Sequence, residues 1–218
     1  MFQAYESTLP YRIALGVAFF LTLGALDWIR NPSNPTRVKE YLFLVFAMFV
    51  SMAYGLVHDH LTATISPEYF LQGKRLAEDP RPFRLAVSLL AIKATYGPGL
   101  LAGALLLIAN NPSHRKPQLR YGELVWFCSY PVVGALSCAF LGAMVLPAVA
   151  DQTWLKDAAL AFAAGDRAGR FLVTWGIHAG SYMGVTLGTV VAVAAVVRKR
   201  KLAAYDMTAE SDKHLETT

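Results

Sequence analysis

Two histidines and two carboxylates fall within a segment of eleven residues. His58, Asp59 and His60 follow one another directly, and Glu68 comes eight residues after the last of them. Imidazole and carboxylate groups are common ligands of zinc, iron and manganese. The same residue types also occur at the polar end of a membrane helix, among lipid headgroups. The segment therefore predicts either a metal site or a polar helix end.

Long apolar blocks dominate the rest of the chain. Of 218 residues, 55% are hydrophobic and 16% are charged. Blocks of about 20 apolar residues match the hydrocarbon core of a bilayer, so we expect an all-α integral membrane protein with a bundle of about five transmembrane helices. The predicted spans are residues 11–29, 39–60, 84–109, 123–149 and 170–197, within a transmembrane domain of residues 1–201 that is followed by a disordered cytoplasmic tail, residues 202–218.

Basic residues gather in short loops and after the last span. A soluble protein with a net charge of +5 would suggest nucleic acid as a partner. Here the placement is typical of topology signals, so we expect a lipid bilayer and no nucleic acid. A cytoplasmic C-terminus and an outer N-terminus put three compact basic clusters inside: Arg30, Arg37 and Lys39; Arg115, Lys116 and Arg120; and Arg198–Lys201.

Two local patterns refine these elements. Gly97-Pro98-Gly99 should kink or break the third span, because proline removes a helical hydrogen bond. The loop 151–169 carries several large apolar residues, which predict a short helix in the membrane interface.

Glycines recur every four residues on one side of the fifth span. Such a stripe lets another helix approach its backbone closely. The fourth span has a matching stripe of small residues, which predicts a glycine zipper between the two. The stripes are Gly176, Gly180, Gly184 and Gly188 on one side, and Gly134, Cys138 and Gly142 on the other.

A polar stripe runs along another side of the fifth span. His178 and Tyr182 are one turn apart on it. A histidine inside a membrane span rarely faces lipid. It either forms a hydrogen bond within the bundle, for which Tyr182 is a convenient neighbour, or it binds a ligand.

The second span has a similar face. Tyr54, His58 and Thr62 share it at four-residue spacing, whereas His60 points the opposite way. We therefore favour His58 as the inward group. Asp59 lies between the histidines and is placed to orient an imidazole.

Depth in the bilayer bears on whether these groups meet. Lys93 and His178 lie at a similar depth of about 12 to 13 Å, and Lys93 either extends to the headgroups or pairs with Asp59 or Glu68. His58 lies nearer the boundary. A tilt or kink is needed to bring it to His178.

The run from His58 to Phe70 resembles the signature of an uncharacterised family of bacterial multi-span membrane proteins, His-Asp-x-x-Thr-x-x-Ile-Ser-Pro-Glu-Tyr-Phe. The resemblance implies that His58, Asp59, Thr62 and Glu68 form one unit in the bacterial cytoplasmic (inner) membrane. It carries no activity with it.

We expect a metal centre in the outer half of the bundle, with zinc, iron or manganese as the ion. Its chemistry would be hydrolytic or oxidative, on a small or lipid-like substrate. The ligands would come from His58, His178, Glu68, Asp59 and His60, with Tyr54, Thr62, Lys93 and Tyr182 around them.

Two alternatives stay open at this point. The first is a haem cytochrome with His58 and His178 as axial ligands. The second is a structural or transport subunit without enzymatic activity. The sequence does not decide whether the protein is an enzyme, and it is compatible with a homo-oligomer or a larger membrane complex.

Overall fold

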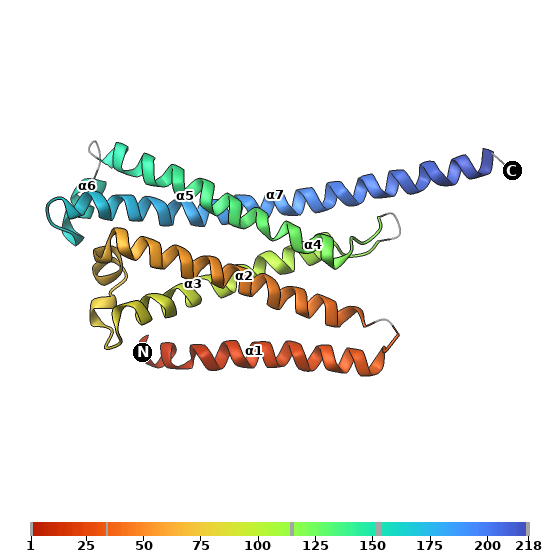
Figure 1. Ribbon diagram of the computed structural model, residues 1–218, viewed down its shortest axis with the longest axis horizontal. Coiled ribbons are helices and arrows are strands. Elements are labelled where there is room, and N and C mark those ends of the chain that lie inside the picture. Colours follow the sequence, from red (N-terminus) through yellow and green to blue (C-terminus); the bar gives the residue numbers. More distant parts are fainter. Residues whose placement is uncertain (1, 34, 114–115, 151–153, 217–218) are drawn as a thin grey trace.

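The chain is helical almost throughout (Figure 1). The structure is a computed structural model, and it describes residues 2–216 except 34, 114–115 and 151–153. No strand occurs among these residues. Five helices are long and apolar enough to cross a membrane, which confirms the expected all-α bundle: Pro10–Arg30, Arg37–Ile65, Phe83–Ala109, Tyr121–Ala150 and Arg167–Tyr205.

The helices follow the predicted spans closely, with two short helical turns between α2 and α3. The fourth predicted span corresponds to α4 and α5 together, and α6 lies in the loop where a short helix was expected. The elements are α1 (Phe2–Arg30), α2 (Thr36–Ile65), a π-helical turn (Tyr69–Gly73), a 3-10 turn (Leu76–Glu78), α3 (Phe83–Ala109), α4 (Tyr121–Phe127), α5 (Ser129–Ala150), α6 (Leu155–Phe162) and α7 (Arg167–Glu216).

The end of α2 follows from the proline beyond it. Ser66 caps the helix in an extended conformation, because a residue that precedes proline is disfavoured in the helical region. The helix therefore continues to Ile65, as the position of Pro67 predicts, which is five residues past the predicted end of the membrane span at residue 60.

α3 is not broken at Gly97-Pro98-Gly99, contrary to the alternative that the sequence allowed. The Ser51 hydroxyl on α2 donates a hydrogen bond of 2.9 Å to the Thr95 carbonyl at this point. Such side-chain hydrogen bonds satisfy backbone groups near a proline in a membrane helix. The bare Gly99 also lies directly against the α2 backbone, so α2 and α3 pack closely here.

α5 and α7 form a second closely packed pair. The backbone of Gly134 lies against Gly184, and the backbone of Gly142 lies against Gly176. A methyl group added at any of these glycines would collide with a carbonyl oxygen of the other helix. The small residues of the two stripes thus lie at this interface.

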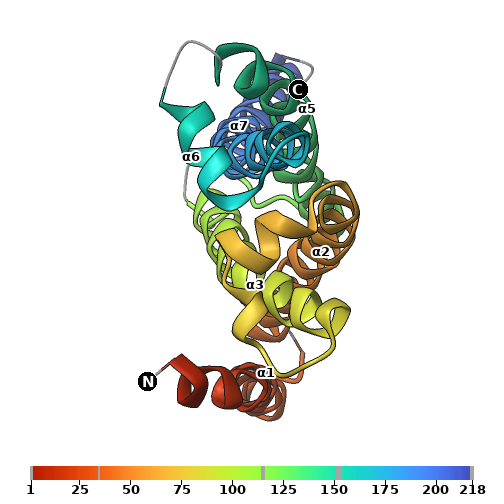
Figure 2. The ribbon, with the colours of Figure 1, turned by 90° about the vertical axis from the view of Figure 1, so that its left-hand side faces the viewer.

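The two pairs stand side by side, with α1 against α2 (Figure 2). Contacts between α7 and the α2–α3 pair are much sparser than contacts within either pair. The sparse packing leaves space between the two helix pairs.

α7 does not end at residue 197, where the sequence places the end of the fifth span. It continues as one helix to Glu216 and projects beyond the bundle (Figure 1). Leu202, Ala203 and Ala204 are good helix formers, so nothing stops the helix after the basic cluster. The predicted boundary between domain and tail at residue 201 therefore coincides with no break in the helix.

Candidate functional site

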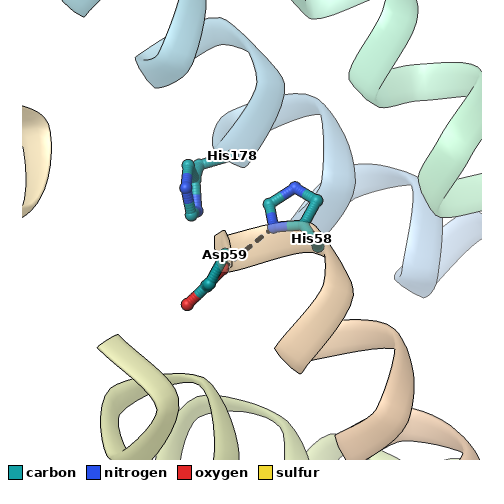
Figure 3. Close-up of side chains that lie close together, drawn as sticks. All are labelled: His58, Asp59 and His178. Atoms are coloured by element: carbon teal, nitrogen blue, oxygen red, sulfur yellow. Dashed lines mark hydrogen bonds and ion pairs between the residues drawn. The ribbon is translucent and has the colours of Figure 1, made fainter. Parts of the chain in front are cut away.

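A group of three residues, two of them buried and His58 partly buried, joins α2 to α7. His58 and Asp59 come from α2 and His178 from α7 (Figure 3). Each offers one ligand atom, and these atoms all lie within 4.8 Å of one another. Asp59 is 7% exposed and His178 is 4% exposed. The structure thus brings His58 and His178 together in space, which the sequence left open.

The lengths of the helices explain how the two histidines meet. α2 ends and α7 begins at the same end of the bundle, next to α6 (Figure 1). His58 lies about 10 Å from the end of α2 and His178 about 16 Å from the start of α7. Because α2 continues to Ile65, His58 lies deeper than the sequence suggested. Their ring centroids are 4.6 Å apart, edge to face.

A chain of hydrogen bonds fixes the His58 ring. Its Nδ1 lies 2.9 Å from the Asp59 carboxylate, and its Nε2 lies 2.9 Å from Ser181 Oγ. Ser181 Oγ is in turn 3.0 Å from the Tyr54 hydroxyl. The ring is thus held at both of its nitrogens, one by the Asp59 carboxylate and the other by the Ser181 hydroxyl. His58 Nδ1 and the Asp59 carboxylate lie close enough to bind the same ion.

His178 is held by a different set of contacts. Its Nε2 lies 3.2 Å from Thr62 Oγ1, whereas its Nδ1 has no hydrogen-bond partner among the residues described. The π-helical turn folds back over the ring: Tyr69 stacks on it at 4.6 Å, and Phe70 meets its edge at 5.6 Å. Burial raises the pKa of the Tyr69 phenol, which keeps it neutral beside the histidine.

Two of the five predicted ligands lie outside the group. His60 Nε2 lies 2.8 Å from Ser88 Oγ on α3, as its helical phase requires. The Glu68 carboxylate accepts a hydrogen bond of 3.2 Å from Ser66 and one of 3.4 Å from Arg167. The segment after Pro67 does fold back over the site, but it brings aromatic rings rather than this carboxylate.

A cavity of about 600 Å³ begins at the histidines. It lies between α2, α3 and α7, in the space between the two helix pairs. Tyr54, Asp59 and Ser181 line its polar end together with the histidines, and most of the remaining wall is apolar. The remaining lining residues are Ser51, Gly55, Ala94, Thr95, Gly97, Pro98, Leu101, Ala102, Leu105, Tyr182, Val185, Thr186, Thr189 and Val190.

Of the four residues predicted to surround the ligands, some contact the site and others do not. Tyr54 and Thr62 form hydrogen bonds to the site, as described above. The Tyr182 ring lies 6.4 Å from that of His178 and is 54% exposed at the cavity. Lys93 is on α3 beside the lining residue Ala94 but does not line the cavity itself.

Sequence reasoning missed three residues of the site. Ser181 lies three residues after His178 and therefore on the same helix face, which is a signal that helical spacing offers. Tyr69 and Phe70 close the run that resembles the membrane-family signature, but their apolar character pointed to no chemistry. Their role as a cover for His178 depends on the turn after Pro67.

Comparison with protein-family models, with curated proteins and with solved structures found no match for this chain. The resemblance of residues 58–70 to a membrane family therefore stays a prediction, and the functional argument rests on the geometry of the site.

Proposed function

We propose that this integral membrane protein binds a transition-metal ion through His58, Asp59 and His178 and uses it on a small or lipid-like substrate. The observation that carries the proposal is the convergence of three ligand atoms within 4.8 Å of one another, two of them from buried residues. A buried carboxylate is costly unless a cation or hydrogen bonds compensate for it. An ion beside Asp59 supplies that compensation.

The spacing suits an ion after a small adjustment. Tetrahedral zinc with ligand distances near 2.1 Å needs ligand atoms about 3.4 Å apart. The side chains must therefore close in by up to about 1.4 Å, which rotation of Asp59 and of the His178 ring can provide. Three protein ligands leave a position open for water or for a substrate oxygen, as in catalytic sites.

The donor set indicates a class of chemistry. Two imidazoles and one carboxylate are found both in zinc hydrolases and in the facial triad of non-haem iron oxygenases. When bound, the ion would polarise an oxygen or activate water or dioxygen. The chain's own contribution is to hold His58 through Ser181, and to shield His178 from water with Tyr69 and Phe70.

A metal ion fits this geometry better than haem. Axial histidines stand on opposite faces of a macrocycle, which separates their rings. Here the rings of His58 and His178 touch at 4.6 Å with an angle of 85° between their planes. Haem would require the two helices to move apart.

Metal analysis of purified variants tests the proposal. After extensive dialysis, we expect about one ion per chain in the native protein and a loss of most of it in His58→Ala and in His178→Ala. His60→Ala is the matched control, because it removes a histidine two residues away that contacts Ser88 instead. A chelator should lower the melting temperature of the native protein and of His60→Ala, since a bound ion stabilises the folded state.

Two results would contradict the proposal. One is equal metal content in all four proteins after loading with zinc, iron and manganese in separate experiments. The other is a haem absorption band that disappears in both His58→Ala and His178→Ala, which would replace the ion by haem.

A further inference from the structure

The cavity is long and runs parallel to the helices. Along α7 it extends from His178 to Val190, about 18 Å, and along α3 from Ala94 to Leu105, about 16 Å. Each length is close to half of the bilayer's hydrocarbon thickness of about 30 Å. At the roughly 30 Å³ that a water molecule occupies in the liquid, a volume of about 600 Å³ corresponds to about 20 water-sized groups. These dimensions suit one extended hydrocarbon chain.

Polarity changes from one end of the cavity to the other. The His58–Ser181 end carries imidazole, carboxylate and hydroxyl groups, whereas Leu101, Leu105 and Val190 line the far end. The threonines there do not make it polar. Thr186 donates to the Tyr182 carbonyl at 3.0 Å and Thr189 to the Val185 carbonyl at 2.8 Å, so both hydroxyls are used within α7.

The far end is accessible from the bilayer. Leu101 is 62% exposed and Val190 is 61% exposed, and both lie on helices that can span a membrane. Apolar side chains exposed at this depth face lipid chains. The cavity is therefore open sideways to the hydrocarbon, through a wall that a lipid can approach.

The polar end lies too deep for a charged headgroup. It is about 10 to 16 Å from the helix ends at which α2 stops and α7 starts. Carrying a phosphate or an ammonium group to this depth is costly. An uncharged oxygen avoids most of that cost, and it can accept hydrogen bonds from hydroxyl groups such as those of Tyr54 and Ser181.

We propose that the cavity binds a neutral, single-chain lipid whose small oxygen-bearing end, a hydroxyl or carbonyl, lies at the His58–Ser181 group while its hydrocarbon chain lies between α3 and α7. This extends the proposed metal centre, because that oxygen occupies the position that the three ligands leave open. The size and apolar lining of the cavity support the assignment independently of the ion.

Native mass spectrometry of the purified full chain with hexadecan-1-ol tests this inference. We expect one bound hexadecan-1-ol per chain, and at least tenfold weaker binding of hexadecanoate, of hexadecylphosphocholine and of butan-1-ol. Gly97→Phe should weaken the binding of hexadecan-1-ol at least tenfold, because Gly97 lines the cavity and an added Cβ there meets no atom within 4 Å. Gly16→Phe on α1 is the matched control, since an added Cβ there also meets no atom.

A second filling variant keeps the test informative if Gly97→Phe does not fold. Leu101→Trp fills the cavity from an exposed position and should weaken binding as well. Unchanged binding in a folded cavity-filling variant would overturn the inference, as would binding of hexadecanoate equal to that of the alcohol.

Metal content separates the two proposals. Lipid binding that Gly97→Phe weakens, in a protein that binds no metal, would support the lipid site and reject the metal centre. Metal binding without lipid binding would support the metal centre and reject the lipid site.

Discussion

Two of the buried polar residues on α7, His178 and Arg200, differ in how fully their hydrogen-bonding groups are satisfied. Near the start of α7, His178 lies close to His58 and Asp59 at the polar end of the cavity. Near the other end of the bundle, Arg200 is only 5% exposed. Its guanidinium donates to four carbonyl oxygens of the connection between α3 and α4: Ala109 at 2.5 Å, Asn111 at 2.6 Å, Pro117 at 2.9 Å and Lys116 at 3.1 Å.

The difference separates a structural role from a binding role. All four carbonyls accept from Arg200, and Asn110 adds two hydrogen bonds with the Leu119 backbone, so these buried groups are satisfied. At the other end, His178 Nδ1 has no partner among the described residues, and His58 Nε2 faces a single hydroxyl. An imidazole nitrogen that has no partner and lies beside a cavity can still bind a ligand. A guanidinium that donates to four carbonyls holds the structure together instead.

Arg200→Ala should have the largest effect on stability. It leaves four carbonyls without their donor, so we expect the free energy of unfolding in detergent to fall by about 3 kcal/mol. Arg200→Lys should recover part of the loss, because an ammonium group reaches fewer of the oxygens. If His178→Ala lowers the free energy of unfolding more than Arg200→Ala does, the assignment of a structural role to Arg200 and a binding role to His178 is wrong.

Ser181→Ala should have an intermediate effect and tests the site end. Loss of one hydrogen bond to His58 should lower the free energy of unfolding by about 1 kcal/mol. A group that orients a ligand also affects the ion, so we expect metal affinity to fall about 10-fold. Competition with a chromogenic chelator measures that affinity.

Ser88→Ala serves as the control for Ser181→Ala. It removes the same kind of hydrogen bond, in this case to His60 outside the group. A similar loss of stability with unchanged metal affinity is expected. An equal fall in metal affinity in both variants would mean that Ser181 acts only through general stability.

Lys199→Ala should have the smallest effect. Lys199 precedes Arg200 in the sequence and forms an ion pair of 2.6 Å with Glu123. The side chains of Lys199 and Glu123 are 48% and 41% exposed. Exposed ion pairs contribute about 0–1 kcal/mol and weaken with salt. Thermal unfolding at low and high salt checks this. A loss comparable to that of Arg200→Ala would show that charge, rather than burial and complete hydrogen bonding, stabilises this end.

Residue types and helical phase predicted part of the site. The four-residue spacing on α2 selected His58 over His60, and the structure places His60 against α3. His178 was recognised because a histidine within a span rarely faces lipid. Glu68 could not be decided in this way, since its partner Arg167 lies 99 residues further along the chain. The same holds for Tyr69 and Phe70, whose position over His178 depends on a turn between helices.

The sequence by itself determined that this is an all-α membrane protein with five spans. Hydrophobicity and helix length are local properties, and the bilayer imposes them on each segment separately. Only the tertiary structure decided that His58 meets His178, that Arg200 closes the opposite end and that a cavity separates the helix pairs. These features depend on which helix faces pack together, and contacts between residues more than 80 positions apart leave no periodic signal in the sequence.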